Sequence, residues 1–306
     1  MKRQILIVMA FACFSGKASA WGPDGHHAVC RIAYDLLKPH VRTKVDKLMS
    51  ADTDGHRYSS FADSCTYADD IRSTGIRQKD YFLNLPRTAK AVTGSGCAGT
   101  ETCVLAAIDL DYAILQSRSA SPSAKATALK FLGHWLGDVH QPLHISFADD
   151  LGGNDIVATG GCGNASKLHS AWDTCLVDYQ GQLGHGARPG DHAAEAQHEA
   201  IVFTYADKLA YDINPGEIAD WSQGQPWQWA DESFQIARQP DVQYCVMKGT
   251  ACQYSATDPI FTDGVSKRTV IADATYQATF GPIVEARIKM AGVRLAKMLT
   301  VALGAN

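Results

Sequence analysis

The chain has no long apolar run beyond its first residues, no excess of basic side chains and no C-x-x-C pair of cysteines. The run at residues 5–14 is too short to cross a bilayer and no later stretch is longer, so no membrane anchor is expected. The formal net charge of −4 excludes a broadly basic surface. A polyanion would therefore have to be bound by metal ions and local groups.

The first twenty residues have the pattern of a secretory signal peptide. A positively charged start is followed by the apolar run at residues 5–14 and by an Ala-Ser-Ala cleavage sequence that ends at Ala20. We therefore predict a signal peptide over residues 1–20, a mature chain that begins at Trp21, and a secreted or periplasmic protein.

The cysteine count agrees with export. Of the nine cysteines, one lies in the predicted signal and eight remain, and an even number in an exported chain favours disulfides. The pairs Cys97–Cys103 and Cys245–Cys252 are expected because each is close in sequence; the remaining pairing is open. A zinc–thiolate site is the alternative, but the missing C-x-x-C spacing disfavours it.

Helical periodicity dominates the rest of the chain. With 46% apolar and 20% charged residues in 306, the composition is that of an ordinary globular protein. Apolar residues recur with helical spacing over residues 25–37 and 103–117. Further helices are expected over 41–49, 67–72, 126–138, 169–179, 193–209 and 276–303, and another opens at 229–233. Residues 81–86 are expected to be extended and 149–163 to form a loop or hairpin. We predict a mainly α, single-domain multi-helix fold over residues 21–306, with few short strands.

One stretch concentrates residues that could bind a metal. His134 and Asp138 are four residues apart, so on a helix both side chains lie on one face. Pro142 cannot continue that helix, and the turn there is expected to bring His144 back toward the same pocket. Imidazole and carboxylate ligands in this spacing suit zinc.

The same spacing recurs at His169 and Asp173. A single such pair also occurs as a hydrogen bond on a helix surface, but two pairs together with His144 favour a metal cluster. The other histidines are expected to be structural or exposed: His27, His40, His56, His140, His185, His192 and His198.

Seven motifs resemble one known family. They are residues 21–26, 68–72, 133–144, 152–154, 168–173, 229–233 and 291–296. In this order, and over essentially the whole mature chain, they are similar to the secreted zinc-dependent single-strand nucleases of the S1/P1 type, which include mung bean nuclease and the plant bifunctional nucleases. The resemblance implies a mainly helical fold with three zinc ions in a cleft.

The resemblance also implies the zinc ligands. These would be Trp21, His26, Asp69, His134, Asp138, His144, His169 and Asp173. Trp21 would bind through the α-amino group freed by signal cleavage and through its carbonyl oxygen, with His26 beside it; the alternative for this side chain is a buried aromatic. Asp138 would bridge two ions, with His134 and Asp69 completing the deeper of these two sites. The third ion would be held by His144, His169 and Asp173.

Further family roles fall on three residues. Arg72 matches an arginine that contacts phosphate, although from spacing alone it would form a surface ion pair with Asp69. Phe82 is a candidate for base stacking, with core packing as the alternative. Asn84 stands where many members carry an aspartate near the catalytic centre.

The chain departs from the family at Tyr81. The family has a histidine ligand there, in a register fixed by Asn84 and Pro86. Tyrosine is a poor zinc ligand because its pKa of about 10 must first be lowered. The neighbouring Asp80 would point to the opposite side of an extended segment. Three zinc ions are expected by resemblance, and two if this change removes the deeper one.

The implied activity is that of an endonuclease. It would hydrolyse the phosphodiester bonds of single-stranded DNA and RNA to 5′-phosphorylated products, act as a 3′-nucleotidase and be a monomer. Two alternatives remain. One is a zinc-dependent phospholipase C of similar three-zinc design, and the other is a zinc-binding protein that has lost catalysis through Tyr81.

Overall fold

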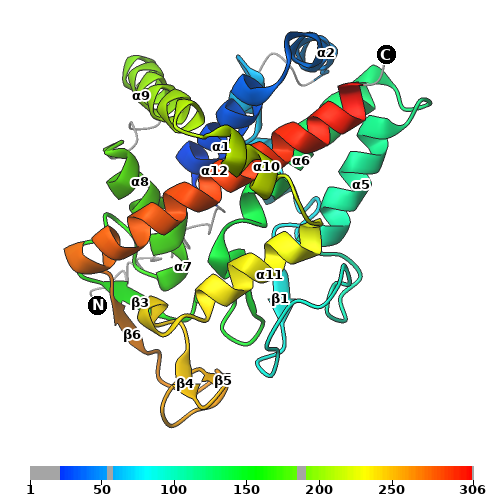
Figure 1. The fold of residues 1–306 in the computed structure, drawn as a ribbon. Helices are drawn as coiled ribbons and strands as arrows, with labels where there is room; N and C mark the ends of the chain where they lie inside the picture. The colour runs from blue at the N-terminus through cyan, green and yellow to red at the C-terminus, as the bar shows by residue number, and fades with distance from the viewer. Residues whose placement is uncertain (1–20, 54–57, 185–190, 305–306) are drawn as a thin grey trace, which may run out of the picture.

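The computed structural model of the protein describes residues 21–53, 58–184 and 191–304, without the side chain of His192 (Figure 1). The predicted signal peptide over residues 1–20 lies outside the described residues, as do His56 and His185.

The chain is mainly helical, as predicted. The helices are α1 (Pro23–Leu36), α2 (Pro39–Ser50), α3 (Phe61–Ser64), α4 (Tyr67–Ile71), α5 (Val104–Gln116), α6 (Pro122–Asp138), α7 (Leu168–Ser170), α8 (Leu176–Gly181), α9 (His192–Tyr211), α10 (Pro215–Trp221), α11 (Pro226–Ala237) and α12 (Ala274–Gly304). Short 3-10 segments are η2 (Arg72–Thr74), η3 (Pro142–His144) and η5 (Pro240–Val242), and η4 (Ala171–Cys175) is a π-helical turn.

Helix starts are the main difference from the prediction. Helices α6 and α11 begin at Pro122 and Pro226, earlier than their apolar periodicity indicated, because proline is well suited to the first helical turn. Helix α10 was not predicted; it is short and has no buried residue. The helix predicted over 169–179 is interrupted by the π turn η4.

Three two-stranded sheets complete the part of the fold that the structure describes. Strand β1 (Leu83–Leu85) pairs in parallel with β2 (Ile145–Phe147), and β3 (Val157–Thr159) pairs in parallel with β6 (Thr269–Ile271). Of the two alternatives predicted for 149–163, the loop is therefore the one observed, with β3 near its end. The only local pairing of β3 in the described residues is a single antiparallel bridge between Val157 and Lys167. The actual hairpin is β4 (Val246–Lys248) with β5 (Ala251–Gln253).

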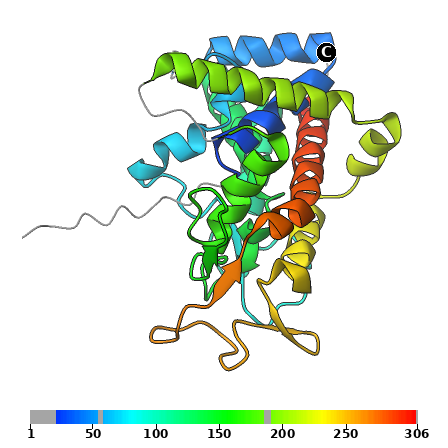
Figure 2. The same ribbon diagram turned by 90° about the vertical axis from the view of Figure 1, so that its left-hand side faces the viewer.

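The long helix α12 crosses the molecule and packs against α1 and α8, while α9 lies along the other side of α1 (Figure 1). Figure 2 shows α9 at one end of the molecule and the β4–β5 hairpin with its following loop at the opposite end. The core between them contains the fully buried indoles of Trp21, Trp135 and Trp172. No described helix is long and apolar enough to cross a membrane.

Four disulfides link the helices and loops. The expected Cys97–Cys103 and Cys245–Cys252 bonds are confirmed. The other two are long-range: Cys30–Cys65 ties α1 to the residue after α3, and Cys162–Cys175 ties the loop after β3 to η4. All eight cysteines beyond residue 20 are therefore used in disulfides, which excludes the zinc–thiolate alternative for them.

Candidate metal centre

The first group of potential ligands forms between α1 and α6. His134 and Asp138 are fully buried one turn apart, with Nε2 of His134 3.5 Å from Oδ2 of Asp138. His26 of α1 places its Nε2 3.5 Å from Oδ1 of the same carboxylate, and its ring stacks on that of His134 at 3.8 Å. A Cβ atom on Gly137 would lie 2.7 Å from Nδ1 of His26. Glycine at this position therefore allows α1 to approach α6 closely.

A second group forms where the chain turns after α6. As predicted, Pro142 begins a 3-10 turn and His144 comes back, with its Nδ1 3.9 Å from Oδ1 of Asp138. Nε2 of His144 lies 3.8 Å from Oδ1 of Asp173 and 3.2 Å from Nε2 of His169. Nε2 of His169 lies 3.5 Å from Oδ2 of Asp173. In each of the two groups, one ligand atom per residue lies within 4.8 Å of the others. Asp138 of the first group also approaches His144 of the second.

Backbone carbonyls orient three of the imidazoles. Nδ1 of His134, His144 and His169 lies 2.8, 2.6 and 2.7 Å from the carbonyl oxygens of Cys65, Tyr81 and Gly152, respectively. A carbonyl can only accept, so each Nδ1 carries the proton and each Nε2 offers a lone pair toward the carboxylates. This arrangement is typical of metal-bound histidine.

Unpaired buried atoms show that this donor set suits a cation. Within the described part of the chain, hydrogen-bond partners are missing for both ring nitrogens of His26, for Nε2 of His134, for both carboxylate oxygens of Asp138 and for Oδ2 of Asp173. Burial raises the pKa of the Asp138 and Asp173 carboxyls well above the usual range and lowers that of His26. Such groups cost free energy when left unpaired. Imidazole nitrogens and carboxylate oxygens are ligands that zinc prefers, so the residues fit this ion.

Asp69 and Arg72 approach the first group from α4. Oδ1 of Asp69 is 3.8 Å from Nε2 of His134 and 3.7 Å from Nη1 of Arg72. The ion pair of Asp69 with Arg72 that their spacing indicated is therefore present. Asp69 also lies beside His134, as expected for a ligand of the deeper ion.

Tyr81 does not occupy a ligand position. Its side chain is buried, its hydroxyl donates to the Ala68 carbonyl at 2.5 Å, and its ring meets that of His134 edge-on. Burial also raises the pKa of this phenol above its usual value, which opposes the phenolate that zinc would need. Asp80 does not substitute: as predicted it points elsewhere, and it accepts hydrogen bonds from Arg77 and Thr102.

Trp21 lies beside the first group. Its indole is fully buried and packs near Gly137, next to His26. The buried-aromatic alternative for its side chain is therefore correct, and it is compatible with a ligand role for the backbone atoms. The free amine needed for that role would arise only from cleavage after Ala20.

A cavity of about 210 Å³ opens beside the second group. Its lining residues are Arg72, Phe82, Asn84, Leu143, His144, Leu151, Gly152, Asn154 and His169. The structure thus brings Arg72, Phe82 and Asn84 together at one opening beside the ligands. Phe82 also packs against the core, so the core-packing alternative is present, and base stacking stays a prediction.

Sequence reasoning assigned no role to two polar residues of this region. Asn154 lines the cavity, and its place in the Gly-Gly-Asn motif was the available signal. Gln141 is buried, and its amide donates to Oδ1 of Asp173. Its position between Asp138 and His144 could have indicated this contact.

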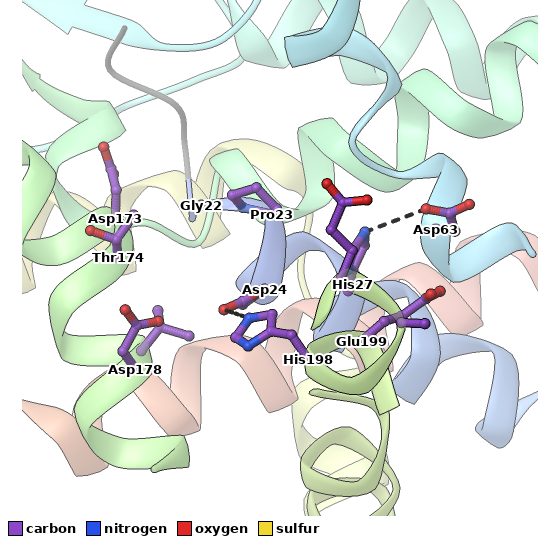
Figure 3. Close-up of a pocket in the computed structure, with 13 residues that line it drawn as sticks. Gly22, Pro23, Asp24, His27, Asp63, Asp173, Thr174, Asp178, His198 and Glu199 are labelled. Atoms are coloured by element: carbon purple, nitrogen blue, oxygen red, sulfur yellow. Dashed lines mark hydrogen bonds and ion pairs between the residues drawn. The ribbon is translucent and has the colours of Figure 1, made fainter. Parts of the chain in front are cut away.

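A larger cavity of about 630 Å³ lies between α1, α8 and α9 (Figure 3). Carboxylates and two histidines line it, and His198 is 2.8 Å from Asp24. This cavity contains neither group of buried ligands, apart from Asp173 at its edge.

Comparison with known proteins agrees with this geometry. The family model described as S1/P1 Nuclease matches residues 21–304. Endonuclease 5 of Arabidopsis thaliana is 28% identical, over 98% of this chain and 96% of its own length. Nuclease S1 of Aspergillus oryzae is 27% identical over 73% of this chain and 75% of its own, and nuclease P1 of Penicillium citrinum is 29% identical over 51% and 58%. The chain therefore belongs to the S1/P1 nuclease family.

Proposed function

We propose that this protein is an exported, zinc-dependent endonuclease. It hydrolyses the phosphodiester bonds of single-stranded DNA and RNA to 5′-phosphorylated products and also acts as a 3′-nucleotidase. The observation that carries the proposal is the meeting of two buried His/Asp groups with Arg72 at the mouth of a cavity lined by Phe82 and Asn84.

Eight residues would hold the metal. The first group, with Asp69 and the backbone of a newly N-terminal Trp21, would hold two ions that share Asp138, and the second group would hold a third. With Tyr81 absent from the ligand set, the deeper ion would have three protein ligands, which leaves a position open. Zinc held here would supply Lewis-acid activation of water and of the phosphoryl group.

The chain's own side chains would bind and orient the substrate. The Arg72 guanidinium, 22% exposed and facing the ligands, would donate to phosphate oxygens and stabilise the charge that builds up on them. Phe82 offers a ring for stacking with an unpaired base, and Asn84 and Asn154 offer amide groups to its edge. A base must leave its duplex to enter a cavity of this size, which favours single strands.

The direct test is cleavage by correctly processed protein. The chain would be expressed with its signal, Trp21 would be verified as the N-terminus by mass spectrometry, and the protein would be incubated with single-stranded and duplex DNA and with RNA. We expect zinc-dependent, chelator-sensitive cleavage of the single strands, with 5′-phosphates on the products.

Arg72→Ala is the matched catalytic variant. It should retain zinc and lose roughly 100-fold to 1000-fold in kcat, because one charge-stabilising donor is removed. Zinc-loaded wild-type protein that leaves nucleic acids intact but hydrolyses phosphatidylcholine in mixed micelles would overturn the proposal in favour of a phospholipase. Zinc binding without turnover of either substrate would indicate a protein that has lost catalysis.

A further inference from the structure

The carbonyl that orients His169 belongs to an unusual loop. Gly152 accepts the Nδ1 proton of His169 at 2.7 Å. Leu151, Gly152 and Gly153 have φ values of 53°, 66° and 82°, so three consecutive residues adopt the left-handed conformation. Leucine adopts this conformation at a steric cost, and surrounding structure must therefore hold the loop in place.

Close packing adds to this requirement. A Cβ atom on Gly152 would lie 2.6 Å from the Leu143 carbonyl oxygen and 3.3 Å from Nδ1 of His169. The Gly152 peptide is thus confined between the segments that contain Leu143 and His169. A small change in its orientation would turn the carbonyl away from the imidazole.

Asp150 clamps the loop through hydrogen bonds of its side chain and its backbone carbonyl. Its Oδ1 accepts hydrogen bonds from the Gly153 amide at 3.1 Å and from the Tyr244 hydroxyl at 2.7 Å. Its backbone carbonyl accepts from the Asp155 amide at 3.2 Å. These bonds span the three left-handed residues and fix both ends of the turn.

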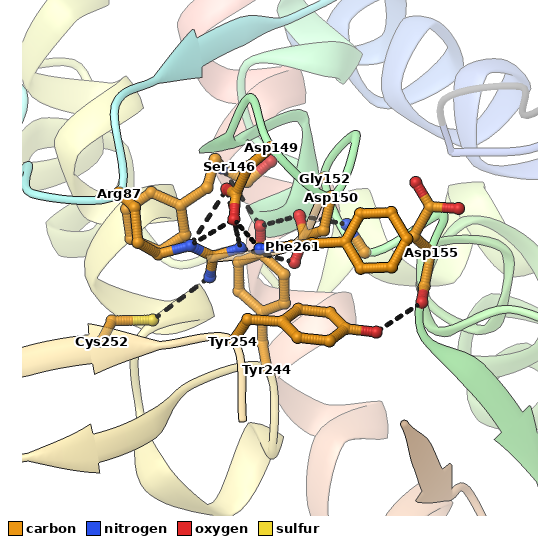
Figure 4. Close-up of polar contacts among 12 residues, drawn as sticks. Arg87, Ser146, Asp149, Asp150, Gly152, Asp155, Tyr244, Cys252, Tyr254 and Phe261 are labelled. Carbon is orange, nitrogen blue, oxygen red and sulfur yellow. Dashed lines mark hydrogen bonds and ion pairs between the residues drawn. The ribbon is translucent and has the colours of Figure 1, made fainter. Parts of the chain in front are cut away.

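Arg87 in turn holds the Asp150 side chain in place, and we call Asp150, Arg87 and Tyr244 together the clamp (Figure 4). Its Nη2 lies 2.8 Å from Oδ2 of Asp150, and its guanidinium also donates to both oxygens of Asp149. The guanidinium carbon is 4.3 Å from the centroid of the Phe147 ring. The Asp150 side chain is fully buried and Arg87 is nearly so, and therefore the pair is largely screened from water.

We infer that Asp150, supported by Arg87 and Tyr244, is a positioning residue for the metal centre. It holds the Gly152 carbonyl in the orientation that fixes the ring of His169, and thereby the direction of its Nε2 toward Asp173. The inference rests on the proposed zinc centre. Contacts that orient a ligand from outside typically change metal affinity by about 10-fold to 100-fold.

The test is zinc affinity measured on the full processed protein. Asp150→Asn keeps the shape of the side chain but removes its charge and one acceptor. We expect one zinc to bind about 10-fold to 100-fold more weakly in competition with a chromophoric chelator, and the others to be unchanged. The melting temperature of the metal-free form is measured for the wild type and for Asp150→Asn.

The matched control is Asp155→Asn on the same loop. The Asp155 carboxylate contacts Lys267, whose side chain is half exposed, and not the glycine peptides. This variant should bind all zinc ions with wild-type affinity. Tyr244→Phe removes a single hydroxyl from the clamp and should weaken the same zinc ion, by less than Asp150→Asn does. It keeps the inference testable if Asp150→Asn does not fold.

A purely structural clamp would give a different result. If the clamp variants lower the melting temperature of the metal-free protein but bind every zinc ion as tightly as wild type, the inference is overturned while the proposed function stands. Failure of the wild-type protein itself to bind zinc would overturn the proposed centre, and this inference with it.

Discussion

The guanidinium carbon of Arg72 lies 4.2 Å from the centroid of the Tyr81 ring. The aromatic side chain at a predicted ligand position therefore supports the residue proposed to bind phosphate. Tyr81→Phe should preserve this support, whereas Tyr81→Leu removes it. We expect about a 10-fold lower kcat/KM for the leucine variant than for the phenylalanine variant, since a desolvated cation–π contact contributes roughly 1–2 kcal/mol. Equal activity of the two zinc-loaded variants would contradict the role of the ring.

Tyr81→His should strengthen zinc binding. The ring of Tyr81 meets that of His134 edge-on at 5.5 Å, so an imidazole placed there could reach the deeper site. Zinc content measured by elemental analysis should stay at three or rise to it, and the deeper ion should resist chelators longer than in wild type. Unchanged chelator resistance would show that the deeper ion does not depend on this position.

Removal of zinc should lower stability as well as activity. The buried lone pairs of His26, Asp138 and Asp173 would be left without a partner. When the free zinc concentration is roughly a thousand times the Kd of a site, binding there adds about 4 kcal/mol to the free energy of unfolding. Chemical denaturation with and without chelator measures this difference, and zinc added back should restore it. Identical curves would be inconsistent with a buried metal centre.

The half-buried Asp178 should make stability depend on pH. Burial, together with the charge of Asp24, raises the pKa of this carboxyl to about 7, whereas the usual value is about 4. Because the pKa is raised in the folded state, the folded protein binds this proton more tightly than the unfolded chain does. The resulting stabilisation is fully present below about pH 4 and is lost as the pH rises to about 7.

Asp178→Asn should remove that loss. Relative to wild type, the variant should gain about 1 kcal/mol at pH 8, after allowance for the exposed part of the side chain, and little at pH 4. Unfolding by urea at several pH values measures the difference. A stability difference that does not vary with pH would argue against the raised pKa.

Glu232 joins two arginines of α12 to α11. Its carboxylate accepts from Nη1 of Arg287 at 2.6 Å and from Nη1 of Arg294 at 2.7 Å, and both arginines are buried. Glu232→Gln should lower the free energy of unfolding by about 3 kcal/mol, because two buried cations lose their counter-charge. The pair of Glu285 with Lys289, in which the cation is less deeply buried, is the control, and Glu285→Gln should cost less than about 1 kcal/mol.

Much of the fold and of the ligand set follows from local patterns. Helical spacing placed α1, α5 and α12, and the end of α6, close to their observed bounds, because each helix has one face that must be buried. The same period placed His134 on one face with Asp138, and the proline after them predicted the return of His144. Proline-initiated starts and the short polar helix α10 were missed, since apolar periodicity is weak there.

The sequence by itself determined that the pairs His134–Asp138 and His169–Asp173 could bind a metal, since four-residue spacing on a helix needs no knowledge of distant segments. Only the tertiary structure decided how those side chains are oriented. The carbonyl that orients His134 comes from Cys65, the clamp on the Gly152 loop comes from Arg87 and Tyr244, and the Tyr81 hydroxyl is bonded to Ala68. Each contact joins segments brought together by packing, and the orientation of a backbone carbonyl does not depend on the identity of its own residue. For that reason no motif encodes it.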